Sequence, residues 1–147
     1  MSGLLLTQKV HGHLAILAVA LALHPVLSTW RATRPTRRTR LSGYLAALLT
    51  VATNVLGWLV YPAYRELVKP DLYAASVTYG QAFEVKEHLA FYALCLSLAG
   101  AALLWAARDE HAETLRGPAR TVWLLCFLCG LGAGVVGVLV ASVRGFA

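Results

Sequence analysis

Four histidines on apolar stretches are the residues best suited to do chemistry in this chain. His11, His13 and His24 lie on the segment KVHGHLAILAVALALHP, and His88 lies where a later apolar segment begins. Imidazole nitrogens bind transition metals, and two imidazoles can hold the iron of a b-type haem from its two sides. The first question is therefore whether any two of these rings can meet.

The depth of two of these histidines can be estimated from the arginines that follow them. His13 lies 18 residues before Arg31, about 27 Å along a helix, and His88 lies 20 residues before Arg108, about 30 Å. Their helices would be the first and third of an up-down bundle, which are diagonal and leave room for a porphyrin. The spacing predicts one haem b between His13 and His88.

The other two histidines are placed by helical periodicity. Eleven residues separate His13 from His24, which brings them to within about 20° of one face, whereas His11 points roughly the opposite way. Ionisable groups within a membrane usually face the bundle or a cavity. We therefore expect the His13 face to be the interior. No other intramembrane histidine lies at the depth of His24, so a second bis-histidine haem is not expected.

Two carboxylates accompany His88 in FEVKEHLAF. Glu84 precedes His88 by four residues and shares its face, and Glu87 is its neighbour. With His11 or His13 they could form a nitrogen-and-oxygen site for Zn, Cu or Fe. Alternatively, Glu84 accepts a hydrogen bond from a ligating imidazole and fixes its tautomer. Acidic residues in a first helical turn also suit the helix dipole without any metal.

Simpler interpretations of the histidines stay open. His11 and His13 could lie among lipid headgroups, and His88 could cap the start of its helix. His24 precedes Pro25, whose missing N–H frees the carbonyl of Leu21, so the imidazole could serve local hydrogen bonding around that kink.

The cysteines and glycines favour packing. Cys126 and Cys129 form a C-x-x-C within an apolar run, where a thiolate is disfavoured, so we interpret them and Cys95 as small apolar packing residues. A small-residue strip follows, which could pack inside the bundle, form a dimer face, or leave clearance for a flat cofactor. The strip consists of Gly130, Gly134 and Gly137, and its candidate partner strip of Ala93, Ser97 and Ala101.

The elements that must position these residues are membrane helices. The 147 residues are 59% hydrophobic and only 14% charged, whereas a soluble domain is about a quarter charged. Four apolar runs each approach or exceed the roughly 20 residues that cross a bilayer, and lipid requires them to be helical. The prediction is an all-α integral membrane four-helix up-down bundle in a single domain, 1–147, with helices at about 8–30, 41–64, 76–107 and 121–143.

Charge orients the bundle. Segments 31–40 and 108–120 hold eight basic residues, against five on the other side, so the arginine-rich side is expected in the cytoplasm and both termini outside it. A bacterial inner membrane is the expected location. In the external connection, 61–87, Pro62 and Pro70 are expected to interrupt the helix, and Ser76 or Thr78 to cap the next one. Aromatic belts are expected at Trp58, Tyr61 and Tyr64 outside, and at Trp30 and Trp123 inside.

These features bound the function. The net charge of +6 resides largely in the arginine loop, which argues against nucleic-acid binding. No nucleotide-binding, hydrolase or paired-carboxylate motif indicates an enzyme acting on its own. Two hypotheses follow. The chain is a b-type haem electron-transfer protein or redox-complex subunit, or it is a cofactor-free scaffold or accessory subunit that contacts another membrane protein or a second copy within the lipid bilayer.

Overall fold

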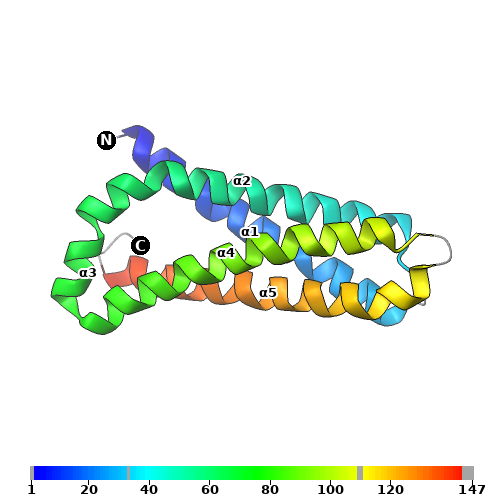
Figure 1. Cartoon of the computed structure of the whole chain (residues 1–147). Helices are drawn as coiled ribbons and strands as arrows, with labels where there is room; N and C mark the ends of the chain where they lie inside the picture. The colour runs from blue at the N-terminus through cyan, green and yellow to red at the C-terminus, as the bar shows by residue number, and fades with distance from the viewer. Residues whose placement is uncertain (1, 33, 109–110, 144–147) are drawn as a thin grey trace.

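A computed structural model describes residues 2–32, 34–108 and 111–143, the side chains of 2–5 and 143 excepted. The described chain is helical almost throughout (Figure 1). Its helices are α1 (Ser2–Arg31), α2 (Arg37–Leu67), α3 (Lys69–Ala75), α4 (Val77–Ala106) and α5 (Ala112–Val143).

The four long helices form an antiparallel bundle, which confirms the predicted fold. Each of them is long and apolar enough to cross a membrane, so the chain is an integral membrane protein. α1 packs on α2 and α4 on α5, while α1–α5 and α2–α4 contacts close the ring (Figure 1). α1 and α4 therefore lie on a diagonal, as expected. α1 begins and α5 ends at the same end of the bundle as α3.

The helices extend beyond the apolar runs that predicted them. α2 begins at Arg37 rather than about 41, and α5 at Ala112 rather than about 121. Thr36 caps α2 by accepting a hydrogen bond from the Thr39 N–H at 3.1 Å. α2 also continues through Pro62 to Leu67, so the expected interruption at Pro62 is wrong. Polar residues such as arginine form helices readily, and the apolar runs mark only the part of each helix that lies in lipid.

The connection between α2 and α4 is a short helix held against α4. Pro70 stands in the first turn of α3, where its missing N–H costs nothing, and Ser76 caps α4, as predicted, by accepting from the Thr78 N–H at 3.2 Å. The Glu84 carboxylate accepts from the Tyr73 hydroxyl and from Lys69 Nζ, each at 2.9 Å. α3 thus closes the end of the bundle opposite the arginine-rich end, between α2 and α4.

The core at the arginine-rich end is built around Trp123. Its side chain is fully buried, and a Cβ placed on Gly43 or Gly100 would lie only 3.2 or 2.8 Å from the indole ring. The expectation that Trp123 belongs to an interfacial belt is therefore wrong, because α2 and α4 each present a glycine that makes room for the ring. Trp30 does lie at the surface, with the Arg120 guanidinium 5.3 Å from its ring centroid.

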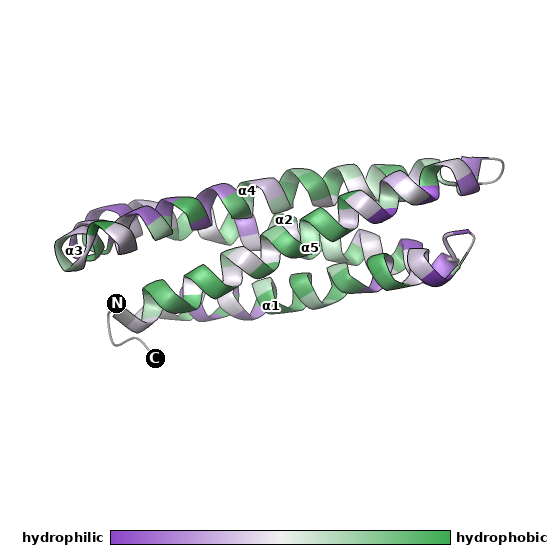
Figure 2. Cartoon of the chain, turned by 90° about the horizontal axis from the view of Figure 1, so that it is seen from below, coloured by the Kyte–Doolittle hydropathy of each residue, from purple (hydrophilic) through white to green (hydrophobic). Residues whose placement is uncertain are grey.

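Large apolar side chains face outward on all four long helices. Hydrophobic residues run along the helices, and hydrophilic ones gather toward the two ends of the bundle (Figure 2). Ile16, Leu59 and Val138 are each about 70% exposed, while much of the interior is made of alanine, glycine, serine and threonine. Lipid is the solvent that suits such a surface, and close helix approach suits such an interior.

Candidate functional site

Nδ1 of three of the four membrane histidines bonds a backbone carbonyl oxygen. Nδ1 of His13 lies 2.8 Å from the carbonyl oxygen of Lys9, and Nδ1 of His88 lies 2.8 Å from that of Glu84, each four residues earlier on its own helix. Nδ1 of His11 lies 2.9 Å from the carbonyl oxygen of Thr53, across the α1–α2 contact. A carbonyl can only accept, so Nδ1 carries the proton in all three rings.

His24 reaches the same protonation pattern through a hydroxyl. Its Nδ1 lies 2.7 Å from Ser42 Oγ, and Ser42 Oγ in turn lies 2.9 Å from the Thr39 carbonyl oxygen. The single hydroxyl proton of Ser42 serves that carbonyl, so the imidazole is the donor to Ser42. His24 therefore does not serve the backbone around Pro25, as one interpretation proposed. There, Thr29 Oγ1 donates to the Pro25 carbonyl at 2.6 Å.

This shared pattern fixes what the rings can bind. With Nδ1–H engaged, the neutral imidazole presents the lone pair of Nε2, which can accept a hydrogen bond or ligate a metal. Metal-binding histidines commonly donate their other N–H to a carbonyl or carboxylate in this way. All four rings are thus in the tautomer that a ligand would need.

The side of α1 that was expected to face the bundle interior faces outward. His13 and His24 do share a face, as predicted, but both side chains are exposed on the outside of the bundle. His11 is the inward ring, half-buried beside Gly57, where an added Cβ would lie 3.2 Å from its Cε1. The prediction that the His13 face is the interior is therefore wrong. Ala18 and Ala22, small and buried, mark the true interior face.

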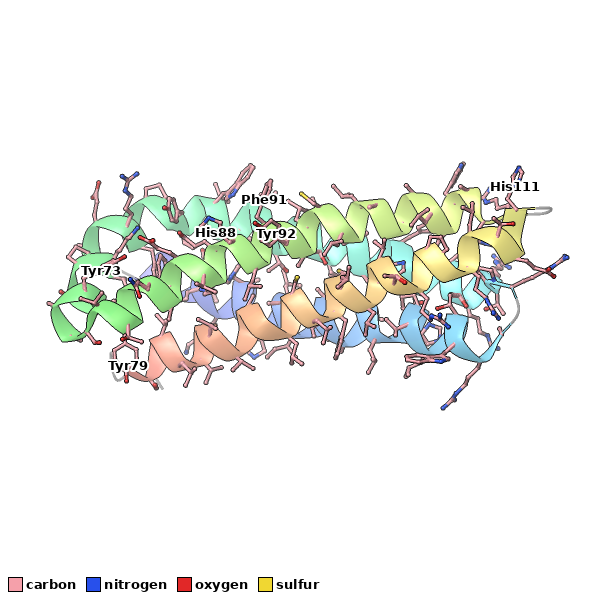
Figure 3. The ribbon with its side chains drawn as sticks, turned by 60° about the horizontal axis from the view of Figure 1, so that its bottom comes forward. Tyr73, Tyr79, His88, Phe91, Tyr92 and His111 are labelled. Carbon is pink, nitrogen blue, oxygen red and sulfur yellow. The ribbon has the colours of Figure 1, made fainter. Side chains whose placement is uncertain are left out.

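The structure does not bring His13 and His88 together. His88 is exposed on α4, near Phe91 and Tyr92, which are exposed as well (Figure 3). Bis-imidazole ligation needs two nitrogens about 4 Å apart across the iron. Two outward rings on diagonal helices are not in that arrangement within one chain, so the haem between them stays a prediction.

Of the two predicted carboxylate partners, Glu84 bonds residues of α3 and not a histidine ring. The Glu84 carboxylate binds Lys69 and Tyr73 (labelled in Figure 3), and only its backbone carbonyl meets His88. These hydrogen bonds to Glu84 raise the pKa of the Lys69 ammonium and the pKa of the Tyr73 hydroxyl. Glu87 is half-buried. Within the described ranges, no group of three His, Cys, Asp or Glu side chains is placed to hold a metal ion.

Lys86 is an inward residue that the sequence analysis did not single out. Its Cε would lie 3.5 Å from a Cβ placed on Gly137 of α5, and its ammonium lies 5.5 and 5.9 Å from the ring centroids of Phe83 and Tyr64. These two rings stack, with centroids 5.5 Å apart. The sequence signal was hidden, because Lys86 stands between two glutamates that resemble a solvated helix start. The aromatic faces give the cation partial compensation for leaving water.

The glycine strip divides between packing and an open position. An added Cβ at Gly130 would lie 2.9 Å from Val19 of α1, and Gly137 accommodates Lys86 of α4. Gly134, between them, is exposed with no atom within 4 Å of such a Cβ. Packing inside the bundle therefore explains two of the three glycines.

Of the three cysteines interpreted as packing residues, Cys126 is buried, Cys129 is half-buried and Cys95 is exposed. The Sγ of Cys126 lies 3.4 Å from the carbonyl oxygen of Ala93 on α4. Ala93 and Ser97 are both buried, and Ala101 is partly buried against the same core. The predicted strip on α4 thus contributes to the interior, at a close α4–α5 contact.

The fold and the histidines define a four-helix integral membrane protein with an arginine-rich end and outward imidazoles on α1 and α4. Comparison with protein-family models, curated protein sequences and solved structures finds no significant match to this chain.

Proposed function

We propose that this chain is an accessory subunit of a larger membrane assembly and that it docks a partner transmembrane helix along the outward face of α1. The observation that carries the proposal is the outward direction of His24. This residue lies seven positions before Arg31, about 10 Å along the helix from the charged end of the bundle. Nδ1 of this imidazole bonds Ser42 of α2, but the side chain is exposed, so at that depth its Nε2 would otherwise face hydrocarbon.

Ionisable side chains within membrane spans almost always face a bundle interior or a water-filled cavity. His13 and His24 face neither within this chain, because both are exposed on the same side of α1. A second helix laid over this side would turn it into an interior. A donor on that helix, such as a hydroxyl or an amide, would then satisfy Nε2.

The spacing of exposed residues on α1 fits a docked helix. An outward row recurs at alternating steps of four and three residues, which is the spacing of a left-handed helix pair. We call this row the α1 seam; it consists of Leu6, Val10, His13, Leu17, Ala20, His24 and Leu27, all exposed. The small side chain of Ala20 lets a partner backbone come close at the middle of the seam. The partner is a transmembrane helix of another membrane protein or of a second copy.

The orientation belongs to the same proposal. With the arginine-rich end in the cytoplasm, the start of α1 and the end of α5 lie outside it, and a bacterial inner membrane suits this distribution of charge. The seam would then run from the outer surface, near Leu6, to the cytoplasmic side, near Leu27.

The test measures association in the bilayer. His24→Leu removes one interhelical hydrogen bond of the kind worth about 0.6 to 1.7 kcal/mol, which corresponds to a weakening of about three- to twentyfold. Leu59→Ala is the control, because Leu59 is 70% exposed on α2, away from the seam. If the partner is a second copy, energy transfer between labelled chains in liposomes should fall for His24→Leu alone. If the partner is another protein, the amount that co-purifies from native membranes should fall instead. Equal association of the wild-type, His24→Leu and Leu59→Ala proteins would contradict the proposal.

A haem b is the second candidate, and it is favoured by one observation. The Nδ1–carbonyl bonds of His13 and His88 leave Nε2 of each ring for an iron. Because these rings face outward, the two ligands of one haem would come from neighbouring chains or from a rearranged bundle. An absorption spectrum of purified protein supplemented with haem decides this. A Soret band that is lost with His13→Ala and with His88→Ala, and kept with His111→Ala, supports the haem; no band contradicts it.

A further inference from the structure

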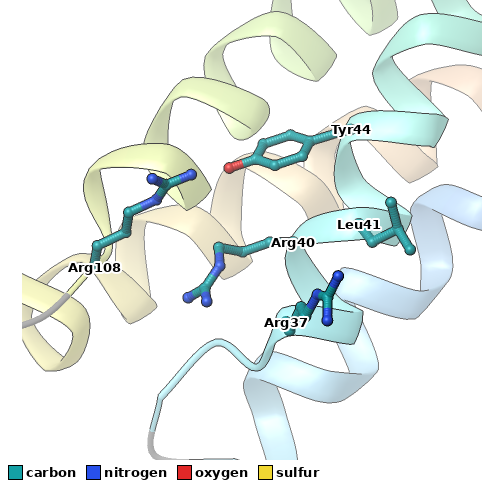
Figure 4. Close-up of a pocket in the computed structure, with 5 residues that line it drawn as sticks. All are labelled: Arg37, Arg40, Leu41, Tyr44 and Arg108. Atoms are coloured by element: carbon teal, nitrogen blue, oxygen red, sulfur yellow. The ribbon is translucent and has the colours of Figure 1, made fainter.

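A pocket of about 460 Å³ opens at the arginine-rich end of the bundle (Figure 4). The pocket is lined from the first turns of α2 by Arg37, Arg40, Leu41 and Tyr44, and by Arg108, two residues beyond the end of α4. Three arginine side chains therefore line one space between α2 and the segment that follows α4, beside the N-terminus of α2. Both the guanidinium charges and the dipole of α2 favour an anion there.

The three arginines of the pocket keep donors for a ligand. In the described part of the chain, the ion pairs are Arg34–Glu113 and Lys69–Glu84, and neither involves a pocket residue. Arg40 donates one N–H to the Pro35 carbonyl at 3.1 Å, and the Arg108 guanidinium stacks 3.9 Å from the Trp105 ring centroid. These contacts hold the two side chains in place and leave other N–H groups of each guanidinium for the pocket.

Tyr44 supplies a second, independent indication of a ligand. Its hydroxyl is buried and has no hydrogen-bond partner among the described residues. In Figure 4 this hydroxyl points toward the same space as Arg108. A buried hydroxyl without a partner is destabilising, and an anionic oxygen in the pocket would satisfy it.

We propose that this pocket binds the phosphate of an anionic phospholipid headgroup. Several planar guanidinium groups and a hydroxyl donor match the oxygens of a phosphate. The position favours a lipid over a soluble phosphate, because the apolar side of the pocket continues along α2. Leu41 in the pocket, and then Leu45 and Leu48 further into the membrane, are exposed to the lipid side and would accompany an acyl chain. Basic pockets between membrane helices bind such headgroups elsewhere.

The experiment compares phosphatidylglycerol with phosphatidylcholine by native mass spectrometry of the full chain in mixed micelles. The wild-type chain should retain phosphatidylglycerol preferentially. At about fivefold for each basic contact, Arg40→Gln combined with Arg108→Gln should weaken retention about 25-fold. Tyr44→Phe, which removes only the hydroxyl, should weaken it severalfold. Arg34→Gln is the matched control, since Arg34 lies in the same connection but pairs with Glu113 outside the pocket.

Three results would overturn the proposal. Equal retention of the two lipids would show that the pocket does not select an anion. If Arg34→Gln lost as much phosphatidylglycerol as the double variant, the lipid would be attracted to the arginine-rich end in general and not bound at a site. Displacement by inorganic phosphate or glycerophosphate at the concentration of the lipid would show that the phosphate comes from a soluble molecule. Tyr44→Phe keeps the test decisive if the double variant fails to fold.

Discussion

Replacing Gly100 by alanine should test the core at the arginine-rich end. An added Cβ would lie 2.8 Å from two atoms of the Trp123 indole, which is fully buried. Overpacking of a tight core costs about 1 to 3 kcal/mol. Against this, glycine to alanine within a helix gains about 1 kcal/mol.

Gly134→Ala is the matched control for that change. It is the same substitution within a long membrane helix, but no atom lies within 4 Å of the added Cβ. The helix-propensity gain is common to both variants and cancels in the comparison. Gly100→Ala should therefore have a free energy of unfolding about 1 to 3 kcal/mol below that of Gly134→Ala.

The assay is reversible unfolding in mixed micelles, with helicity followed by circular dichroism and the indole environment by tryptophan fluorescence. Gly100→Ala should shift both the midpoint and the folded-state emission, because Trp123 contributes to that emission. Gly134→Ala should leave the emission unchanged. Equal stability of the two variants would refute the conclusion that Trp123 occupies a slot made by glycines.

Two further predictions concern the half of the bundle that contains α3. The raised pKa values of Lys69 and Tyr73 mean that their bonds to Glu84 stabilise α3 below about pH 10, the ordinary range of both groups, and are lost as pH rises through the raised values. In the wild-type chain, the protection of residues 69–76 from hydrogen exchange, relative to the unfolded chain, should fall above that pH. In Glu84→Gln this protection should be low already at neutral pH. Identical profiles of protection against pH in the two proteins would contradict this. Gly57→Leu should push the His11 ring away from the Thr53 carbonyl and cost about 1 to 3 kcal/mol, and an unchanged His11 nitrogen NMR signal would contradict the assigned contact.

The fold was largely predictable because lipid dictates it. Apolar runs of 20 residues or more must be helices, and short connections make neighbouring helices antiparallel, so the diagonal placement of α1 and α4 followed. The cap at Ser76 was predictable because a serine hydroxyl can accept a hydrogen bond from a backbone N–H of the first helical turn. α3 was not predicted, although Pro70 in its first turn was an available signal.

The orientation of α1 was not predictable from polarity. In a membrane helix both the lipid side and the bundle side are apolar, so the expectation depended on the two histidines and chose the wrong side. Residue size was the better signal, because the interior of this bundle selects small residues such as Ala18 and Ala22. Burial of Trp123 depends on Gly43 and Gly100, which are distant in sequence and meet only in the folded chain.

Site-specific photo-crosslinking in native membranes tests the central claim most directly. A photoreactive amino acid in place of Leu17, which is 53% exposed on the α1 seam, should produce a protein adduct of defined mass. The same amino acid in place of Leu59, which is 70% exposed on α2, should react with lipid only. A defined adduct at position 17 alone is the predicted result. Lipid adducts alone at both positions would contradict the conclusion that α1 docks a partner helix.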